Sequence, residues 1–482
     1  QQKAEKQFQS IGKFHSFSFK LPAGVNLGRY QCSDREKRMR SEGSSSRKKL
    51  ARASVDFDLL AFLHVQPGDL PKGVGADVIY LTPIFKAYSN HKYDTLDYTQ
   101  VSPEFGTRQD LLSLIEATHA KGMRLMLDGV FNHMAKRSPA FIQAQGNPKS
   151  RYADWFKFGA QYKNGYRAFA NVPSLPAINL ESADVQNTLW VGKDSIVRRY
   201  LKDGIDGWRL DVAFDMGPAA LAGITKAAHQ TKPGSAVVGE ISGYPANWFD
   251  SLDGVFNFTS QQIAARSLSG ELPGGRAGML LNRLVQDAGI ENLLKSWLLI
   301  DNHDTPRATH MIPDATNRRL VQALQLTLPG SPVIYYGTEL GMEGGGDPEC
   351  RAPMRWDLAT EDNADLKWVK QWVRYHQTMP ALKIGDFRAL DTDKLLAFSR
   401  TTGKLRESVL VVLNPTDSEV TETFSTRIGR LMSWGGLKDL IGGSTERSIN
   451  GLMKVTVKPH SIMLLVPDTS VSQGYSSYER IP

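Results

Sequence analysis

Short, continuously apolar runs recur along most of the chain. Residues 78–81 form the first clear run, which Pro83 ends, and further runs lie at 124–127, 205–210, 236–239, 255–258, 297–300 and 333–336. Runs of this length are typical of strands buried on both faces of a parallel sheet. Segments with helical spacing lie between some of them, at 107–122 and 218–229. The repeated units predict an α/β fold, a (β/α)8 TIM barrel, with functional residues at the C-terminal strand ends.

Two stretches break this alternation and indicate additional domains. The stretch 134–200 is rich in Tyr and Trp and too long for an ordinary barrel loop, which predicts a small domain inserted after strand 3, beside the site. After residue 379 the runs become short and alternating, which predicts a C-terminal antiparallel β-sandwich domain. The map is a basic, atypical N-terminal segment (1–56), the barrel (57–133 and 201–379), the inserted domain (134–200), the sandwich (380–467) and a loose tail (468–482).

The net charge of +8 is concentrated at one end of the chain. Residues 1–55 hold 13 Lys and Arg against 4 Asp and Glu, whereas residues 56–482 hold 45 against 46. Because this basic segment carries no recognisable nucleic-acid-binding module, no nucleic-acid partner is expected. No apolar run approaches the roughly 20 residues that span a bilayer, so no membrane partner is expected either. Alternation at 16–21 suits a strand, and 50–63 suits a helix.

The two cysteines, Cys32 and Cys350, are too few for a disulfide framework and are expected to be unpaired thiols. The two cysteines do not indicate a cellular compartment. The sequence does not begin with Met. If residue 1 follows signal cleavage, the expected location is secreted or periplasmic, and otherwise it is cytoplasmic.

Four of the predicted strands end in residues capable of acid–base chemistry. These ends are 128–133, 207–215, 240 and 301–304. Arg209 and Asp211 alternate along one strand, so they project from the same face. Buried charges cost several kcal/mol unless they are paired, so a structural Arg–Asp bridge is an alternative interpretation of this pair alone. The presence of the three other polar strand ends favours an active site.

In this order, the four stretches resemble the alpha-amylase family of glycoside hydrolases. The resemblance runs from about residue 73 to the C-terminus and depends on the ordered set, since each motif alone is weak. Three further stretches are similar to the neopullulanase, cyclomaltodextrinase and maltogenic amylase group: His91-Lys92-Tyr93-Asp94-Thr95, Leu175-Pro176-Ala177-Ile178-Asn179 and 346–354.

The resemblance implies that Asp211 is the nucleophile, that Glu240 is the acid/base and that Asp304 is a third carboxylate gripping the sugar hydroxyls. In a retaining enzyme the first two carboxyl groups lie about 5–5.5 Å apart. We expect Arg209 to favour the ionised form of Asp211 and to belong to the substrate-binding set. The apolar residues before Glu240 are expected to keep a proton on its carboxyl group.

The resemblance also implies substrate contacts. His133 and His303 are expected to bind sugar hydroxyls, and Tyr93 to stack on a glucose ring. The alternatives are that each histidine is a structural residue with its hydrogen bonds made inside the protein, and that Tyr93 is an ordinary packing residue. Asp94 is expected to pair with a nearby arginine in the substrate-binding region. Arg351 is expected to bind either a sugar hydroxyl or an aspartate.

Asn132 matches a family asparagine that ligates a structural calcium ion, and oxygen ligands suit Ca²⁺. Asp215, however, stands where relatives usually carry His or Glu, and the family's N-terminal calcium loop is not recognisable. Calcium is therefore expected as a structural ion only, and no organic cofactor is expected.

The function expected from these residues is retaining hydrolysis of α-1,4-glucosidic bonds in starch, maltodextrins, cyclomaltodextrins or pullulan. A transglycosylase on the same substrates uses the same residues, and a non-catalytic carbohydrate-binding protein on the same barrel is a third hypothesis. All three carboxylates are present, which argues against the third. Because residues 1–72 are too short and too charged for an added dimerising β-domain, a monomer is expected.

Overall fold

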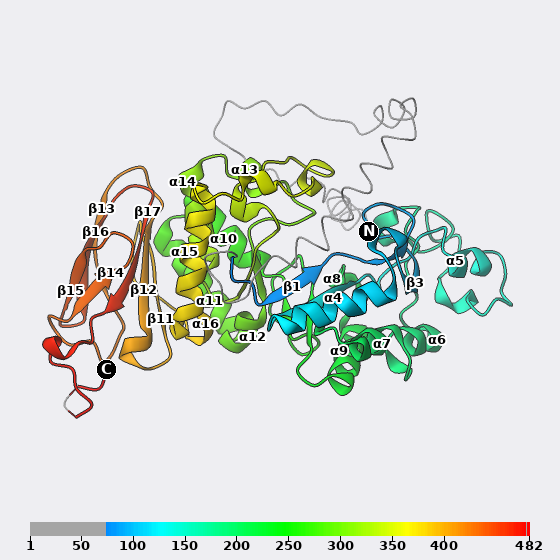
Figure 1. Ribbon diagram of the computed structural model, residues 1–482, viewed down its shortest axis with the longest axis horizontal. Coiled ribbons are helices and arrows are strands. Elements are labelled where there is room, and N and C mark those ends of the chain that lie inside the picture. Colours follow the sequence, from blue (N-terminus) through cyan, green and yellow to red (C-terminus); the bar gives the residue numbers. More distant parts are fainter. Residues whose placement is uncertain (1–73, 479) are drawn as a thin grey trace.

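The computed structural model describes residues 74–478 and 480–482. The predicted N-terminal segment 1–56, with its strand at 16–21 and helix at 50–63, lies outside the described residues, as does Cys32. Within these residues, the chain forms a central strand-and-helix body with an antiparallel β domain at one end and a helical excursion at the other (Figure 1).

Parallel strands in sequence order form the centre of the molecule. Five of them pair in the order β1, β4, β5, β6, β7, and β8 pairs in parallel with β9. A parallel bridge from Phe256 to Trp297 joins the two groups. Their bounds are Val78–Leu81, Arg124–Gly129, Gly207–Leu210, Ala236–Gly239, Gly254–Val255, Trp297–Leu299 and Ser331–Val333. This order agrees with the predicted barrel.

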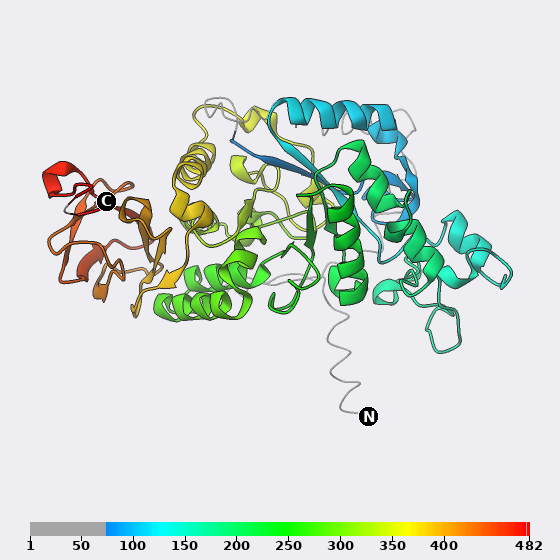
Figure 2. The same ribbon diagram turned by 90° about the horizontal axis from the view of Figure 1, so that it is seen from below.

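Helices surround these strands, as the second view shows (Figure 2). They include α4 (Arg108–Ala120), α7 (Ile196–Asp203), α9 (Pro218–Thr231), α10 (Phe258–Leu268), α11 (Gly274–Ala288), α14 (Ala315–Gln325) and α15 (Ala364–Thr378). In α4 a capping box between Thr107 and Asp110 satisfies the first amides, and one face buries Leu111, Leu114 and Ile115. The barrel helices are thus amphipathic, and their apolar faces pack against the strands, which are buried on both faces.

Between β4 and β5 the chain leaves the barrel. This excursion contains α5 (Pro139–Ala144) and is held by an aromatic cluster in which Phe141 contacts Phe156, Phe158 and Tyr166, with ring centroids 4.8–5.7 Å apart. An antiparallel bridge from His133 to Ala177 ties it to the end of β4. The excursion therefore begins directly at the polar end of a barrel strand.

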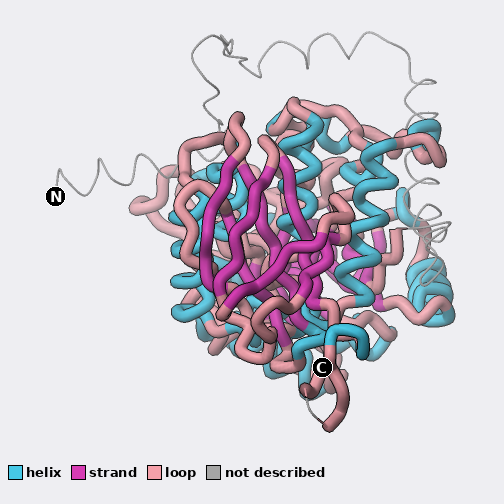
Figure 3. The backbone as a smooth tube through the Cα atoms, turned by 90° about the vertical axis from the view of Figure 1, so that its left-hand side faces the viewer, coloured by secondary structure: helices cyan, strands magenta, loops and turns pink. Residues whose placement is uncertain are grey.

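The C-terminal domain is one antiparallel sheet of eight strands, in the order β10, β11, β12, β17, β14, β15, β16, β13. This domain faces the viewer in Figure 3. The bounds are Arg388–Ala389, Leu396–Thr401, Ser408–Asn414, Ser461–Pro467, Gly436–Asp439, Thr445–Ile449, Leu452–Val457 and Val420–Ser425. Leu410 and Leu465 on one part of the sheet share a core with Phe424 and Val455 on the other. The sheet thus folds over itself into two packed layers.

The C-terminal tail differs from the prediction of a loose segment. Tyr475 is 2% exposed and packs into the core of the β domain, and its hydroxyl accepts a hydrogen bond from the Met432 amide at 3.3 Å. One apolar ring in a polar stretch produces no periodic pattern, so the sequence did not reveal this anchor.

Among the residues that the structure describes, no helix has both the length and the apolar character required to cross a membrane.

Candidate active site

The site is centred on the guanidinium group of Arg209 in β5, which is fully buried. Its Nη1 donates to both carboxylate oxygens of Asp128, at 3.0 and 2.7 Å, and to Asp211 Oδ1 at 2.8 Å. Its Nη2 lies 2.8 Å from Glu240 Oε2 as an ion pair without hydrogen-bond alignment. One positive charge is therefore divided among three carboxyl groups.

Strand register explains why these groups meet. Asp128 in β4 pairs with Arg209 in β5, and Leu210 in β5 pairs with Gly239 in β6. Asp211 directly follows Leu210, and Glu240 directly follows Gly239. Because neighbouring parallel strands end at one edge, all four polar residues lie at the same mouth of the barrel.

Asp128 is completely buried, and Arg209 is not its only hydrogen-bond donor. The hydroxyl groups of Tyr80 and Tyr93 donate to its Oδ2 at 2.5 and 2.9 Å, in addition to Arg209. Burial raises the pKa of both tyrosines well above the usual value, so the hydroxyls keep their protons. Asp128 thus anchors Arg209 and Tyr93. It was recognised from sequence as a polar strand end, but not as a site residue, and Tyr80 was missed.

The surroundings of the Asp211 and Glu240 carboxyl groups differ from those expected from the sequence. Burial raises the pKa of Asp211 well above its usual range; Arg209 opposes this, and the Glu240, Asp128 and Asp304 carboxyls add to it. Glu240 is not enclosed by apolar groups, because its side chain is 18% exposed and meets Arg209. Arg209 does favour the ionised form of Asp211, as predicted, but burial and the nearby carboxyl groups outweigh it and raise the pKa of Asp211.

Backbone geometry brings the two carboxyl groups together. The amide of Val212, directly after Asp211, donates to Glu240 Oε2 at 3.1 Å. Val212 has φ 50° and ψ 39°, a left-handed conformation that is costly for a β-branched residue. Such strain is of order 1–3 kcal/mol and persists only where the surroundings impose it. Here it turns the Val212 amide toward Glu240.

Asp304 lies at the mouth of the site and is the most exposed of the predicted carboxylates, with 46% of its side chain accessible. His303 Nε2 is 3.0 Å from its Oδ2, and Arg351 Nη2 donates to its Oδ1 at 3.1 Å. Burial acts to raise the pKa of Asp304, but His303, Arg209 and Arg351 outweigh it and hold the pKa below the usual range. Of the two roles expected for Arg351, the structure places it as an aspartate partner.

Tyr93 and His303 form one stacked unit, with ring centroids 5.3 Å apart and planes 6° apart. His303 Nε2 is 2.6 Å from the Tyr93 hydroxyl. His133 is 2% exposed, its Nε2 lies 2.9 Å from the Tyr93 carbonyl, and its ring stacks on Phe169. Burial lowers the pKa of His133 to about 4, so it is neutral at pH 7. These contacts give His133 a structural role in holding Tyr93.

The expected pairing of Asp94 with an arginine is wrong. Asp94 Oδ1 accepts hydrogen bonds from the Ser89 amide at 2.9 Å and the Ser89 hydroxyl at 2.6 Å. Among residues 74–478 and 480–482, its carboxylate forms no ion pair with an arginine. The local turn takes the carboxylate first because a Ser five residues away costs less chain entropy than a distant partner.

Comparisons with known proteins place this geometry in a family. The model described as "Alpha amylase, catalytic domain" matches residues 69–412, and "Maltogenic Amylase, C-terminal domain" matches residues 387–464. The chain belongs to the alpha-amylase family. The polar strand ends that meet at Arg209 thus lie within the family's catalytic domain, and the predicted fold class and family are confirmed.

Individual members of the alpha-amylase family resemble the chain over most of its length. Neopullulanase 2 of Thermoactinomyces vulgaris is 32% identical over 81% of this chain and 68% of that protein. A cyclomaltodextrinase of a Bacillus species is 33% identical over 71% and 63%. The solved structure of cyclic α-maltosyl-(1→6)-maltose hydrolase from Arthrobacter globiformis has a TM-score of 0.70 and 25% identity, covering 81% and 86%. The chain thus spans roughly two thirds of the two curated relatives.

Asn132, the predicted calcium ligand of this alpha-amylase domain, is 4% exposed at the end of β4. Its Nδ2 lies 3.5 Å from His133 Nδ1, and its main-chain carbonyl oxygen accepts a hydrogen bond from the Ile178 amide at 2.9 Å. Within the described ranges no group of three or more His, Cys, Asp or Glu side chains is arranged to hold a metal. The side-chain oxygen of Asn132 has the chemistry of a Ca²⁺ ligand, and the calcium site stays a prediction.

A second buried polar cluster supports the loop that carries His303 and Asp304. Asp301 accepts the Ala308 amide at 2.8 Å and the Thr338 hydroxyl at 2.8 and 2.9 Å. Fully buried Arg307 donates to the Tyr336 carbonyl. Burial raises the pKa of Asp301 to about 6 and that of Glu339 to about 7. The motif at 301–304 signalled Asp301, but no sequence pattern signalled Arg307 or Glu339.

Replacing Arg209 should destabilise the fold, because it leaves Asp128 and Asp211 buried without their cation. We expect Arg209→Met to lower the free energy of unfolding by about 3–5 kcal/mol at pH 7, measured by urea denaturation. Tyr80→Phe is the matched control, since it removes one neutral donor to Asp128 and should cost about 1–3 kcal/mol. Equal losses in the two variants would contradict a charge-centred site.

Glu339 should make stability fall as the pH rises. Its folded-state pKa of about 7 lies above its ordinary value of 4.5, so the folded chain binds more protons than the unfolded chain between these values. Glu339→Gln should therefore gain stability relative to wild type from pH 4.5 to 7, by up to about 3 kcal/mol, and no more above pH 7. Urea denaturation across this range measures it, and a constant difference would refute it.

Proposed function

We propose that the chain is a retaining glycoside hydrolase that cleaves α-1,4-glucosidic bonds in starch, maltodextrins, cyclomaltodextrins or pullulan. The observation that carries the proposal is the contact of Asp211 and Glu240 with one guanidinium group, at the mouth of an alpha-amylase catalytic domain. Retaining hydrolysis needs one carboxylate to attack and one carboxylic acid to protonate the leaving oxygen. The names of the relatives, neopullulanase and cyclomaltodextrinase, support this substrate class.

In this proposal Asp211 attacks the anomeric carbon and Glu240 donates the proton. If Asp128, Asp211 and Glu240 were all ionised, they would leave two uncompensated negative charges around buried Arg209, so one carboxyl group retains a proton. Glu240 is the group able to turn, because its side chain is 18% exposed. When Glu240 leaves Arg209 for the glycosidic oxygen, the full positive charge returns to Asp211 and Asp128. Asp211 then ionises by passing its proton to Glu240, and Glu240 donates that proton to the glycosidic oxygen.

Asp304 acts in the proposal as a permanently charged group at the mouth. Arg351 and His303 hold its oxygens, while 46% of the side chain stays accessible to a sugar. A fixed carboxylate that accepts hydrogen bonds from sugar hydroxyls stabilises the flattened ring of the transition state more than the ground state. Tyr93, His303 and Arg351 surround this position and form the proposed substrate-binding set.

A transglycosylase is the alternative activity, because it shares the covalent intermediate and differs only in the acceptor. Water and a sugar acceptor would both reach the intermediate through the same mouth, where 46% of the Asp304 side chain is accessible. Incubation with maltotriose, followed by chromatography of the products over time, separates the two activities: glucose and maltose without longer oligosaccharides indicate hydrolysis.

Removing either reacting carboxyl should abolish turnover while leaving the fold in place. We expect Asp211→Asn and Glu240→Gln each to lower kcat on soluble starch by roughly a thousandfold or more. Ser89→Ala is the control, because it changes the Asp94 turn and leaves the three carboxylates untouched. Near-wild-type turnover in either carboxyl variant would end the assignment.

We propose calcium, where it binds, as a structural ion with Asn132 as one ligand. Its support is the position of this buried amide at the end of β4 and the preference of Ca²⁺ for oxygen. Chelation with EDTA should then lower Tm and leave kcat at 25 °C unchanged, because an ion bound only by the folded state stabilises it. An unchanged Tm after exhaustive chelation would exclude the ion.

We also propose that the chain is a monomer. The support is the excess of basic residues at 1–55, which repel a second copy of the same segment. The mass in solution, read by light scattering, decides between 53.4 kDa and a multiple of it.

A further inference from the structure

Two adjacent tyrosines follow β9 and hold the loop that carries Arg351. The Tyr335 hydroxyl donates to the Cys350 carbonyl at 3.1 Å, and the Tyr336 hydroxyl donates to the Ala352 carbonyl at 2.7 Å. These two carbonyl groups belong to the residues directly before and after Arg351. The two hydrogen bonds therefore fix the backbone around a single residue, which is the arginine at the mouth of the site.

The loop before Arg351 has a backbone that is costly to order. It begins with three consecutive glycines, 344–346, and its regular structure is the short 3-10 helix Glu349–Arg351. Glycine has more conformational freedom to lose on folding than any other residue. At the start of the loop the Arg307 amide donates to the Gly344 carbonyl at 3.0 Å. Hydrogen bonds from other segments thus set the course of this loop, at its start and again beside Arg351.

A buried guanidinium group supports both tyrosines. The Arg307 side chain is fully buried, and its guanidinium carbon lies 4.7 Å from the Tyr335 ring centroid and 4.6 Å from the Tyr336 ring centroid. A cation over an aromatic face attracts the ring. The two ring centroids are 4.7 Å apart and the planes are inclined by 65°. Burial raises the pKa of Tyr335, so its hydroxyl keeps the proton that it donates. Arg307 thus fixes the directions in which the two hydroxyls point.

Arg351 connects this support to the sugar-facing side of the site. Its Nε donates to the His303 carbonyl at 2.8 Å, and its Nη2 donates to Asp304 Oδ1 at 3.1 Å. Nε also lies 3.3 Å from Asp347 Oδ1, and the Cys350 thiol donates to the same His303 carbonyl at 3.4 Å. The guanidinium group is planar and presents its donors in a fixed fork. A shift of the Arg351 backbone would therefore move Nη2 relative to the Asp304 carboxylate.

We propose that Tyr335 and Tyr336 are positioning residues for Arg351 and, through it, for the Asp304 carboxylate. The proposal rests on the proposed function, in which Asp304 binds sugar hydroxyls most strongly in the transition state. The loop carbonyls occupy both tyrosine hydroxyls, so the tyrosines act through the arginine and not on the sugar. Their contribution is the fixed geometry of the Arg351–Asp304 pair.

A double-mutant cycle tests this dependence on Arg351. The variant Tyr335→Phe/Tyr336→Phe removes both hydroxyls and keeps both rings over Arg307. It should lower kcat/KM for maltotriose about tenfold, mainly through kcat, because a misplaced positioning group costs rate. Arg351→Ala should lower kcat/KM at least as far. Adding the two Phe substitutions to Arg351→Ala should lower it by less than about twofold more, and full additivity of the two effects would overturn the proposal.

Hydrogen–deuterium exchange tests the position of the loop without substrate. The Arg351 and Ala352 amides donate within the loop to the Pro348 and Glu349 carbonyls, at 3.1 and 3.2 Å. If the tyrosine hydroxyls hold this turn, both amides should exchange about tenfold faster in the double Phe variant, because exchange follows local opening. Exchange at the wild-type rate would also overturn the proposal.

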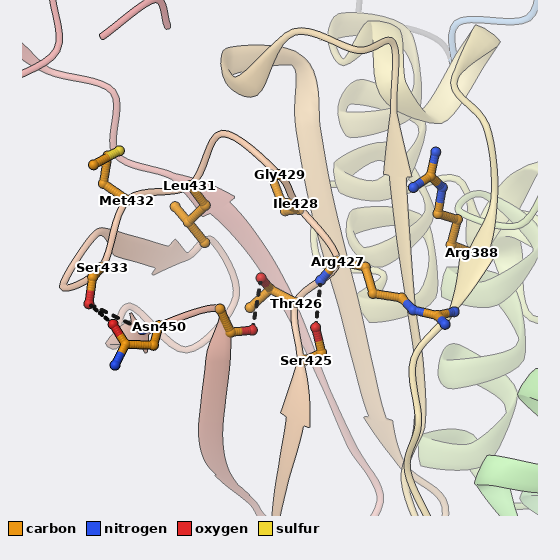
Figure 4. A pocket seen from close by; sticks show the side chains of 11 residues that line it. Arg388, Ser425, Thr426, Arg427, Ile428, Gly429, Leu431, Met432, Ser433 and Asn450 are labelled. Carbon is orange, nitrogen blue, oxygen red and sulfur yellow. Dashed lines mark hydrogen bonds between the residues drawn. The ribbon is translucent and has the colours of Figure 1, made fainter.

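Two variants control for a general loss of stability. Tyr375→Phe removes a hydrogen bond of the same kind, from a tyrosine hydroxyl to the Leu440 carbonyl at 3.1 Å. Ser433→Ala removes the bond from Ser433 Oγ to Asn450 Oδ1 at 3.2 Å, which joins a loop to a turn in the β domain (Figure 4). Both variants should keep kcat/KM for maltotriose within about twofold of wild type. A loss in either that equals the loss in the double Phe variant would assign the effect to stability and overturn the positioning role.

The two proposals fail separately. A wild type that cleaves no α-glucan refutes the proposed hydrolase, and the exchange measurement still decides whether the tyrosines position Arg351. A wild type that hydrolyses maltotriose, with Phe substitutions that add fully to Arg351→Ala, refutes the positioning role alone.

Discussion

The active site depends on how one buried positive charge is divided. Arg209 meets Asp128, Asp211 and Glu240 through the same guanidinium group, and it is fully removed from water. A buried cation with three carboxyl partners leaves a negative excess, which burial makes costly and which a proton on one carboxyl group reduces. Asp128 is held by two tyrosine hydroxyls as well as by Arg209, whereas the Glu240 side chain is 18% exposed.

Much of this arrangement follows from the sequence, because parallel strands leave strong local signals. Apolar runs end at the residues that carry the chemistry, so Asp211, Glu240 and Asp304 could be placed at one barrel mouth before any coordinates. The ion-pair partners of Arg209 could not be predicted. Whether Arg209 faces Asp211 alone or also Asp128 is decided by the register between β4 and β5, which join residues 81 positions apart. The sequence therefore did not show that burial and the neighbouring carboxyl groups raise the pKa of Asp211 despite Arg209.

Other misses have local causes. Asp94 was expected to find an arginine, but the neighbouring Ser89 closes a short turn first. Tyr475 anchors the tail as a single ring, and one residue has no period to detect. For His133 the sequence did not show the partners, since its Nε2 lies 2.9 Å from the Tyr93 carbonyl and its ring stacks on Phe169, and its contact with sugar stays a prediction. In each case the residue type was informative about polarity or burial, whereas its partner depended on packing that the sequence does not spell out.

The junction between the barrel and the β domain is packed as tightly as the interior of either domain. Leu320 and Trp372 of α14 and α15 share one hydrophobic core with Phe398 and Val411 of the β domain. Arg400, buried in β11, donates across the junction to the Thr327 carbonyl at 2.7 Å. Separating the two domains would expose this shared core to water and remove the acceptor of Arg400 Nη1. The position of the β domain is therefore set by the barrel helices that it covers.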